Sequence, residues 1–203
     1  MRLLLVRHGQ SVWNEAGRWQ GQADPPLTPL GRAQALEASS KIGTVESIYS
    51  SPLERSANTA QLISDSIGIG PVIELPGLME RFAGEWQGLT KAEIGEQYPG
   101  YLEQRRRPPS WEPDSEVQDR VLAAMGAIAI THGATSTEDQ SPDDVDVLAV
   151  AHAGVIYAIE SMLGASHERL ANLGGRWLRY GPAGWELGER VELLEESTVP
   201  DQI

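Results

Sequence analysis

The sequence predicts an α/β fold, a three-layer α/β/α sandwich with a mostly parallel central sheet. Short apolar runs at residues 3–6, 45–50, 72–75 and 145–151 are typical of buried strands. Segments with apolar residues at helical spacing separate these runs, and strands that alternate with helices form parallel sheets covered on both faces. No linker or internal repeat divides the 203 residues, so we expect a single domain over residues 1–203.

End signals mark the helical segments. A helix over residues 29–42 begins at the N-cap Thr28, and a helix that opens at residues 51–52 ends at Gly68. Apolar residues at helical spacing predict two further helices, over residues 115–131 and 153–163.

Two stretches interrupt the alternation. Residues 76–113 are rich in Gly, Pro and Trp, and we expect a lid-like insertion there with one short helix near residues 91–98. Residues 134–144 are polar and acidic, which is typical of a surface loop or a disordered insertion. The tail over residues 176–194 alternates as strands do around a turn at 181–184.

Charge and composition limit the partners. Asp and Glu number 29 against 16 Lys and Arg, a formal net charge of −13 that repels nucleic acid. A phosphorylated ligand is repelled too, so a phosphate site would have to concentrate arginines. The absence of cysteine excludes disulfides and a thiol nucleophile. With no long apolar stretch and no signal-peptide pattern, we expect a cytoplasmic protein without a membrane partner.

Residues suited to phosphate chemistry follow three of the predicted strands. Arg7 and His8 follow the first strand, Arg55 lies shortly after the second, and His152 directly follows the late strand. Ligands bind beyond the carboxyl ends of parallel strands, and arginine offers a planar fork of donors to phosphate oxygens. The residues alone do not decide whether the histidines are core residues, metal ligands or catalytic groups. Nor do they decide whether the arginines are ion-pair partners or ligand-binding groups.

Four ordered blocks of the sequence resemble the histidine phosphatase superfamily, the phosphoglycerate-mutase-like group of branch 1: LVRHGQSVWN, GQADPPLTPLGRAQA, SSPLERSANTA and VAHAGV. An Arg-His-Gly triplet alone is a weak signal, whereas four blocks in the family's order are specific. The resemblance covers residues 5 to about 163. It implies a phosphoglycerate-mutase-like fold and a phosphatase that requires no metal and no other cofactor.

The resemblance also implies a role for each matching residue. His8 matches the nucleophile that becomes phosphorylated, and Glu80 matches the proton donor, with Glu85 as its rival five residues on. The residues that match groups holding the phosphoryl oxygens are Arg7, Arg55 and His152. The substrate-binding positions are then Arg7, Asn14, Gln20, Gly21, Arg55, Arg81, Lys91 and His152.

These residue types fit in-line phosphoryl transfer. Fixed positive groups stabilise the charge that spreads over the phosphoryl oxygens. A neutral imidazole attacks phosphorus and splits the reaction into two easier steps. A carboxylic acid protonates the leaving alkoxide, and its carboxylate later accepts a proton from water. His152 would serve best protonated, a form that a neighbouring phosphate dianion favours.

Three functions fit these residues: a metal-independent phosphomonoesterase acting on a small phosphorylated metabolite through a phosphohistidine, a cofactor-dependent phosphoglycerate mutase, and a non-catalytic phosphate-ligand-binding protein. Mutases of this family usually have ERHYG where this chain has ERFAG at residues 80–84, and they are longer, which favours the phosphatase. No catalytic residue is missing, which disfavours the binding protein.

Residues 19–22 and 84–90 are similar to actinobacterial glucosyl-3-phosphoglycerate phosphatases. That substrate is therefore one candidate beside other sugar phosphates, phosphoglycerates and nucleotide-derived phosphates. Family members are often dimers, so a homodimer is one candidate assembly, although the sequence does not fix the oligomeric state.

The sequence does not decide the roles of several further residues. The run Arg105, Arg106 and Arg107 either binds a second anionic group of the substrate or is a solvated helix face, and the same alternatives hold for Lys91. Trp13 and Trp19 either line the pocket or pack in the core. We expect His132 and His167, which match no block, at the surface.

Overall fold

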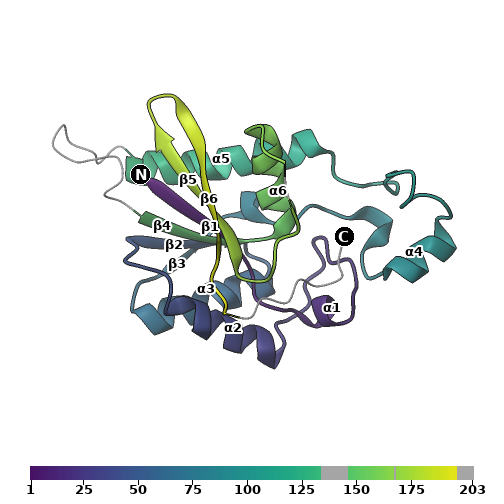
Figure 1. Cartoon of the computed structure of the whole chain (residues 1–203), viewed down its shortest axis with the longest axis horizontal. Helices are drawn as coiled ribbons and strands as arrows, with labels where there is room; N and C mark the ends of the chain where they lie inside the picture. Colours follow the sequence, from purple (N-terminus) through teal and green to yellow (C-terminus); the bar gives the residue numbers. More distant parts are fainter. Residues whose placement is uncertain (134–145, 167, 196–203) are drawn as a thin grey trace.

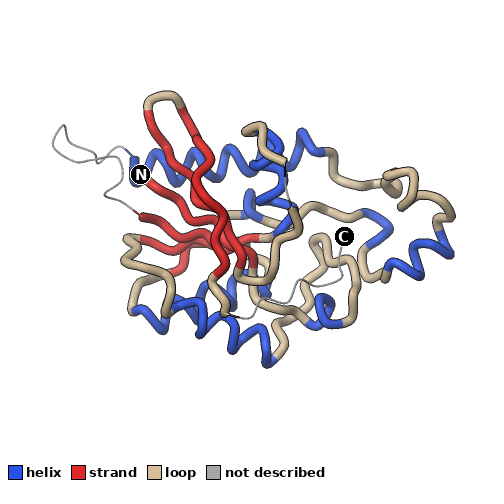
Figure 2. The backbone as a smooth tube through the Cα atoms, viewed as in Figure 1, coloured by secondary structure: helices blue, strands red, loops and turns tan. Residues whose placement is uncertain are grey.

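The computed structural model describes residues 1–133, 146–166 and 168–195. They form a six-stranded sheet in the order β3-β2-β4-β1-β5-β6, with helices on both faces (Figure 1, Figure 2). β1 to β4 pair in parallel, and β5 and β6 add an antiparallel hairpin beside β1. The expected three-layer α/β sandwich with a mostly parallel sheet is confirmed. Its strands are β1 (Arg2–Arg7), β2 (Ser47–Ser50), β3 (Val72–Glu74), β4 (Asp146–Ala151), β5 (Gly174–Gly181) and β6 (Gly184–Glu192).

Two apolar cores separate the sheet from its two helical layers. Successive residues of a strand point to opposite faces, so a strand buried on both faces must be apolar throughout. In β1, Leu3 and Leu5 pack under α5 and α6, whereas Leu4 and Val6 pack under α2 and α3. The helices are α1 (Val12–Glu15), α2 (Pro29–Ser39), α3 (Glu54–Ile67), α4 (Lys91–Gln97), α5 (Asp114–Gly133) and α6 (Ala153–Met162), with 3-10 turns η1 (Pro76–Leu78) and η2 (Gly84–Trp86).

The structure differs from the predicted elements in one helix that was not expected and in some bounds. α1 was not predicted, because four residues are too few to show periodicity; its N-cap Ser11 and Asn14 form a capping box. α3 begins at Glu54 rather than at residues 51–52. The predicted loop at residues 134–144 lies outside the described residues.

The fold brings three strand ends to one edge of the sheet. β1, β4 and β2 are neighbours and run parallel, so Arg7, Ala151 and Ser50 end at the same side (Figure 1). The loop after β1 is pressed against α2, because a Cβ on Gly9 would lie 2.5 Å from the Gly31 carbonyl oxygen. The backbone beside the first strand end is therefore held against a helix.

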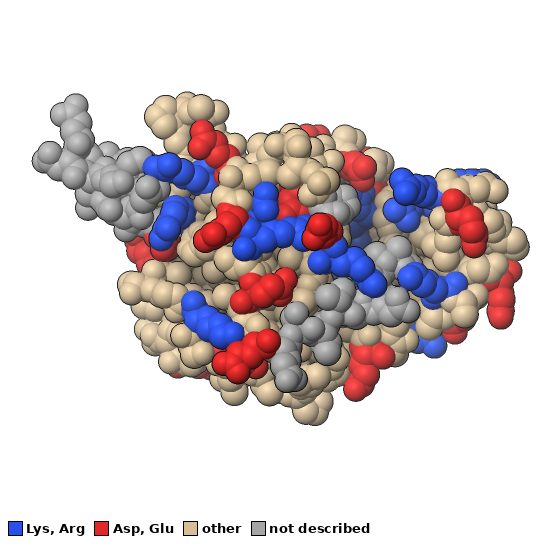
Figure 3. All heavy atoms as spheres, in the orientation of Figure 1, with Lys and Arg blue, Asp and Glu red and all other residues tan. Residues whose placement is uncertain are grey.

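Basic and acidic side chains are interspersed on the face drawn in Figure 3, although the chain carries a net charge of −13. Over the described ranges, no helix is long and apolar enough to cross a bilayer.

Candidate active site

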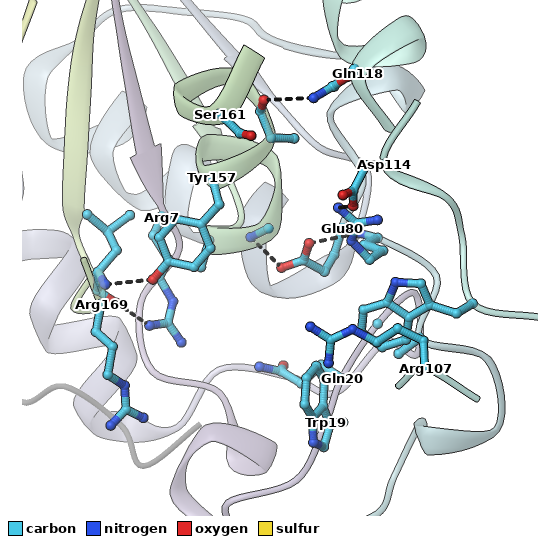
Figure 4. A pocket seen from close by; sticks show the side chains of 18 of the residues that line it. Arg7, Trp19, Gln20, Glu80, Arg107, Asp114, Gln118, Tyr157, Ser161 and Arg169 are labelled. Atoms are coloured by element: carbon cyan, nitrogen blue, oxygen red, sulfur yellow. Dashed lines mark hydrogen bonds and ion pairs between the residues drawn. The ribbon is translucent and has the colours of Figure 1, made fainter. Parts of the chain in front are cut away.

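A cavity of about 750 Å3 lies beyond the carboxyl ends of β1 and β4 (Figure 4). Two sets of residues are named for their place in the site. The floor is the buried group at and after the strand ends: Arg7, His8, Arg55 and His152. Arg7 and His8 line the cavity, whereas Arg55 and His152 contact His8 and are not lining residues. The lid segment is residues 76–113, between β3 and α5. The cavity is lined by residues of the floor and the lid segment, together with residues 19–21, α5, α6 and residues 168–170.

His8 is held as a neutral ring with its lone pair on Nε2. Its Nδ1 donates to the Gly9 carbonyl oxygen over 2.6 Å, which places the proton on that nitrogen. Arg55 Nε donates to His8 Nε2 over 3.2 Å. Burial, followed by the charges of Arg55 and Arg7, lowers the pKa of His8 well below its ordinary value. His8 therefore stays neutral at neutral pH, and its Nε2 lone pair accepts the hydrogen bond from Arg55 Nε.

Arg55 is oriented by two backbone carbonyls. Its Nη1 donates to the Ala23 carbonyl oxygen over 2.8 Å and its Nη2 to that of Gly21 over 2.9 Å. Burial lowers its pKa to about 10, so the guanidinium keeps its charge at neutral pH. Gly21 has a φ of 52°, and a Cβ there would meet Gln87 Oε1 at 2.5 Å. A glycine is therefore needed for the turn that holds Arg55.

Arg7 and His152 complete the floor. Arg7 Nη1 donates to the Leu170 carbonyl oxygen over 2.6 Å. His152 Nε2 lies 2.9 Å from Ser51 Oγ, and its buried Nδ1 has no hydrogen-bond partner within the described residues. The rings of His8 and His152 meet edge to face, 5.1 Å between centroids. Nδ1 of His152 is thus a buried polar atom whose hydrogen-bonding capacity is unused.

The pKa of His152 is lowered in the folded protein as well. Burial, followed by the charge of Arg55, holds it well below its ordinary value. The ring is therefore neutral beside the arginines of the floor, whereas the expected protonated form is that of the phosphate complex. A bound phosphate dianion would offset the same charges and favour the protonated form.

Glu80 is held by both oxygens. Oε1 accepts from the Arg81 backbone N–H over 2.7 Å, and Oε2 accepts from the Gly154 N–H over 3.2 Å (Figure 4). A Cβ on Gly154 would lie 2.2 Å from Glu80 Oε1, so this approach requires glycine after His152. Glu85, the rival carboxylate, is exposed, bonds to Tyr98 Oη and does not line the cavity.

Of the remaining predicted substrate-binding residues, some line the cavity and others do not. Gln20 and Arg81 line the cavity, and Ser11 Oγ donates to Gln20 Oε1 over 2.7 Å. Asn14 is buried behind the cavity lining, where its Oδ1 accepts from the Ser11 N–H. Lys91 is exposed at the first residue of α4 and does not line the cavity.

The three consecutive arginines, Arg105 to Arg107, also differ in whether they line the cavity. Arg105 and Arg107 line the cavity, whereas Arg106 stacks on Tyr101, with 4.0 Å between its guanidinium carbon and the ring centroid. Arg107 stacks on Trp111 at 4.7 Å and has no hydrogen-bond acceptor within the described residues. Neither a wholly solvated run nor a wholly ligand-facing one describes these three residues.

The sequence left the roles of Trp13 and Trp19 undecided. Trp19 lines the cavity, and its ring packs against Trp86 in a tilted arrangement and against Trp111 edge to face. Trp13 lies against Gly88 instead.

His132 is not a surface residue. It is 5% exposed, and its Nε2 lies 2.9 Å from Tyr49 Oη because the last turn of α5 packs over β2. His167 lies outside the described residues.

Several lining residues carried no sequence signal. They lie within none of the four sequence blocks, and the packing of α5, α6 and the following loop brings them to the cavity. These residues are Asp114, Gln118, Tyr157, Ser161, Glu168, Arg169 and Leu170. Within the described part of the chain, no three His, Cys, Asp or Glu side chains are grouped so as to hold a metal ion.

The cavity concentrates arginines in an acidic chain. Three carboxylates, Glu80, Asp114 and Glu168, line it beside five arginines, Arg7, Arg81, Arg105, Arg107 and Arg169. A site of this composition attracts anions locally in spite of the net charge.

Known proteins are similar to this chain in sequence and in fold. Residues 3–190 match the model of the histidine phosphatase superfamily (branch 1). A glucosyl-3-phosphoglycerate phosphatase from Mycobacterium tuberculosis is 35% identical over 167 residues, which cover 80% of this chain and 74% of that protein. A metal-independent phosphoserine phosphatase from Arabidopsis thaliana is 34% identical over 167 residues, covering 77% of this chain and 66% of that protein. A solved structure of mycobacterial glucosyl-3-phosphoglycerate phosphatase with VO3 superposes with a TM-score of 0.81 at 30% identity, over 93% of this chain and 97% of that one.

Proposed function

The chain belongs to the histidine phosphatase superfamily (branch 1), and on that premise we propose that it is a metal-independent phosphomonoesterase that passes phosphate from a small metabolite to His8 and then to water. The observation that carries the proposal is the state of His8. Its ring is neutral and lines the cavity, and its Nε2 accepts a hydrogen bond from Arg55 Nε, a bond that must yield before this nitrogen attacks phosphorus. A neutral nitrogen nucleophile beside fixed cations is what phosphoryl transfer to a side chain requires.

The first step forms a bond from His8 Nε2 to phosphorus and breaks the bond from phosphorus to the leaving oxygen. Arg7, Arg55 and His152 hold the phosphoryl oxygens, where negative charge spreads in the transition state. Glu80, protonated for this step, gives its proton to the leaving alkoxide.

The second step releases phosphate. Water attacks the phosphorus of the phosphohistidine, the nitrogen–phosphorus bond breaks, and the Glu80 carboxylate accepts a proton from the water. His8 returns to the neutral form, and Glu80 is protonated again for the next cycle. The ring proton stays on Nδ1 throughout, because the Gly9 carbonyl oxygen accepts it.

The substrate is a small phosphorylated metabolite. Relatives are named for glucosyl-3-phosphoglycerate and for phosphoserine, so both belong in the first substrate panel. The arginines of the lid segment, Arg105 and Arg107, favour a leaving group with its own negative charge, as in 3-phosphoglycerate or a glycosylated form of it.

The test is hydrolysis of p-nitrophenyl phosphate by wild type and His8→Ala with EDTA present. We expect wild-type turnover to survive the chelator and His8→Ala to lose more than about 1,000-fold, because the covalent route is gone. His132→Gln is the matched control, since it alters a buried histidine away from the cavity, and it should keep its activity. Quenching with labelled substrate should trap acid-labile phosphate on wild type alone.

Other outcomes point elsewhere. Residual activity of a few per cent in His8→Ala would exclude the phosphohistidine. Absent hydrolysis with interconversion of phosphoglycerates in the presence of their bisphosphate would identify a mutase. Phosphate binding without either reaction would identify a binding protein.

A further inference from the structure

The carbonyl group that orients Arg7 is itself held by a tyrosine. Arg7 Nη1 donates to the Leu170 carbonyl oxygen over 2.6 Å, and the Leu170 N–H donates to Tyr157 Oη over 2.7 Å. Figure 4 shows the two bonds meeting at one residue. Leu170 is 1% exposed and Arg7 is 6% exposed, so water does not readily replace either partner.

Leu170 needs this support because it lies in irregular backbone between α6 and β5. A loop carbonyl orients a guanidinium only when the loop has one position. Tyr157 belongs to α6, is partly buried and packs against the core under that helix. The hydroxyl therefore ties the loop to a rigid element.

The same helix carries a second part of the floor. Its N-cap is His152, five residues before Tyr157. Through Leu170, the helix thus sets the position of Arg7 relative to His152. Two groups expected to hold the same phosphoryl oxygens are placed by one rigid body.

We propose that Tyr157 is a positioning residue for Arg7, acting through Leu170. This inference rests on the proposed function, in which Arg7 binds the transferred phosphoryl group. Because that group is common to all substrates, the effect of Tyr157 is the same for every leaving group. Tyr157 also lines the cavity, and a direct contact with the leaving group would instead give an effect that varies with the substrate.

Tyr157→Phe removes the hydroxyl and keeps the ring. On p-nitrophenyl phosphate and phosphoserine alike, we expect kcat/KM to fall about fivefold, the size expected for one neutral hydrogen bond. Orthovanadate carries no leaving group, so its inhibition constant should rise by a similar factor. Tyr98→Phe is the matched control: it removes a hydroxyl that bonds to exposed Glu85, and both constants should stay unchanged. Thermal unfolding confirms that each variant is folded.

A double-mutant cycle separates positioning from general damage. In an Arg7→Ala background, Tyr157→Phe should leave vanadate inhibition unchanged, because no guanidinium remains to be positioned. An equal loss in both backgrounds, a loss that differs between substrates, or no loss in wild type would overturn the inference. If Tyr157→Phe causes no loss but the wild-type protein hydrolyses phosphate esters, only the inference about Tyr157 fails and the proposed function stands. If the wild-type protein hydrolyses no phosphate ester, the inference and the proposed function both fail.

Discussion

The floor and the lid segment of the cavity are built in opposite ways. The floor follows the ends of parallel strands, and His8, Arg55 and His152 are at most 2% exposed. The nitrogens of His8 and Arg55 are held mainly by backbone carbonyls. The lid segment is mostly irregular, and Arg105 in it has a φ of 53°. Several of its side chains pair with one another or with α5, as when Arg81 pairs with Asp114.

This difference separates two tasks. Each nitrogen of His8 and Arg55 that binds a buried backbone carbonyl has one position, so the floor keeps one arrangement of charge and protonation for the proposed phosphoryl transfer. Side chains that hold one another can be exchanged without disturbing the sheet. We therefore expect changes in the floor to affect all substrates, and changes in the lid segment to depend on the leaving group.

Glu80 tests this division most strongly, because it comes from the lid segment yet is the proposed proton donor of the chemical step. Glu80→Gln keeps the shape and an oxygen for the Gly154 N–H but has no proton of suitable acidity. We expect kcat on phosphoserine to fall about 100-fold, and on p-nitrophenyl phosphate only a few-fold, since p-nitrophenolate leaves without protonation.

Glu85→Gln is the matched control for Glu80→Gln, being an exposed carboxylate of the same segment outside the cavity. It should change kcat less than twofold on either ester. Equal losses on the two esters in Glu80→Gln would remove Glu80 as the proton donor.

The lowered pKa of His8 in the floor should make the free energy of unfolding depend on pH. The pKa of His8 is lowered in the folded protein, so below pH 6.5 the unfolded chain binds a proton that the folded one does not. The free energy of unfolding therefore falls as pH falls below 6.5, by about 1 kcal/mol per pH unit from this residue, and is unaffected by it above.

Urea unfolding of wild type and His8→Asn between pH 5 and 7.5 isolates this contribution. The wild-type curve should be steeper below pH 6.5, and the two should run parallel above it. Parallel curves throughout would mean that His8 binds its proton equally well in the folded and unfolded chains.

The sequence predicted the fold and the residues of the floor for one physical reason. Runs such as residues 3–6 are apolar at every position because both faces of the strand are buried, and the polar residue after each run must then lie at the sheet edge. Arg7 and His152 are placed by this rule alone. Their roles came from the resemblance, not from the pattern.

The sequence did not predict where the side chains of residues 105–107 and of His132 lie, although it predicted the segment and the helix that carry them. Within residues 105–107, a step of one residue and the positive φ of Arg105 separate a cavity-lining side chain from one stacked on Tyr101. His132 lies in the last turn of α5, and its polar ring is buried because Tyr49 and Glu46 supply partners from a distant part of the sequence. Both are matters of tertiary contact.

The smallest expected effect distinguishes neighbouring arginines of the lid segment. Arg107 is held over Trp111 by stacking, and no described residue accepts a hydrogen bond from it. Its donors are therefore left for an anionic leaving group, unlike those of Arg81, which bind Asp114 and the Glu112 carbonyl oxygen. Arg107→Ala should raise KM for 3-phosphoglycerate about fivefold, and leave KM for p-nitrophenyl phosphate unchanged.

Arg106→Ala is the matched control, because its side chain lies on Tyr101 outside the cavity lining. It should leave both KM values unchanged, although it is one residue away and carries the same charge. Equal effects of the two substitutions would mean that the lid segment acts through its total charge. A rise confined to Arg107→Ala would instead assign the leaving group to one guanidinium, and would make the lid segment, rather than the floor, the part of this phosphatase that selects its substrate.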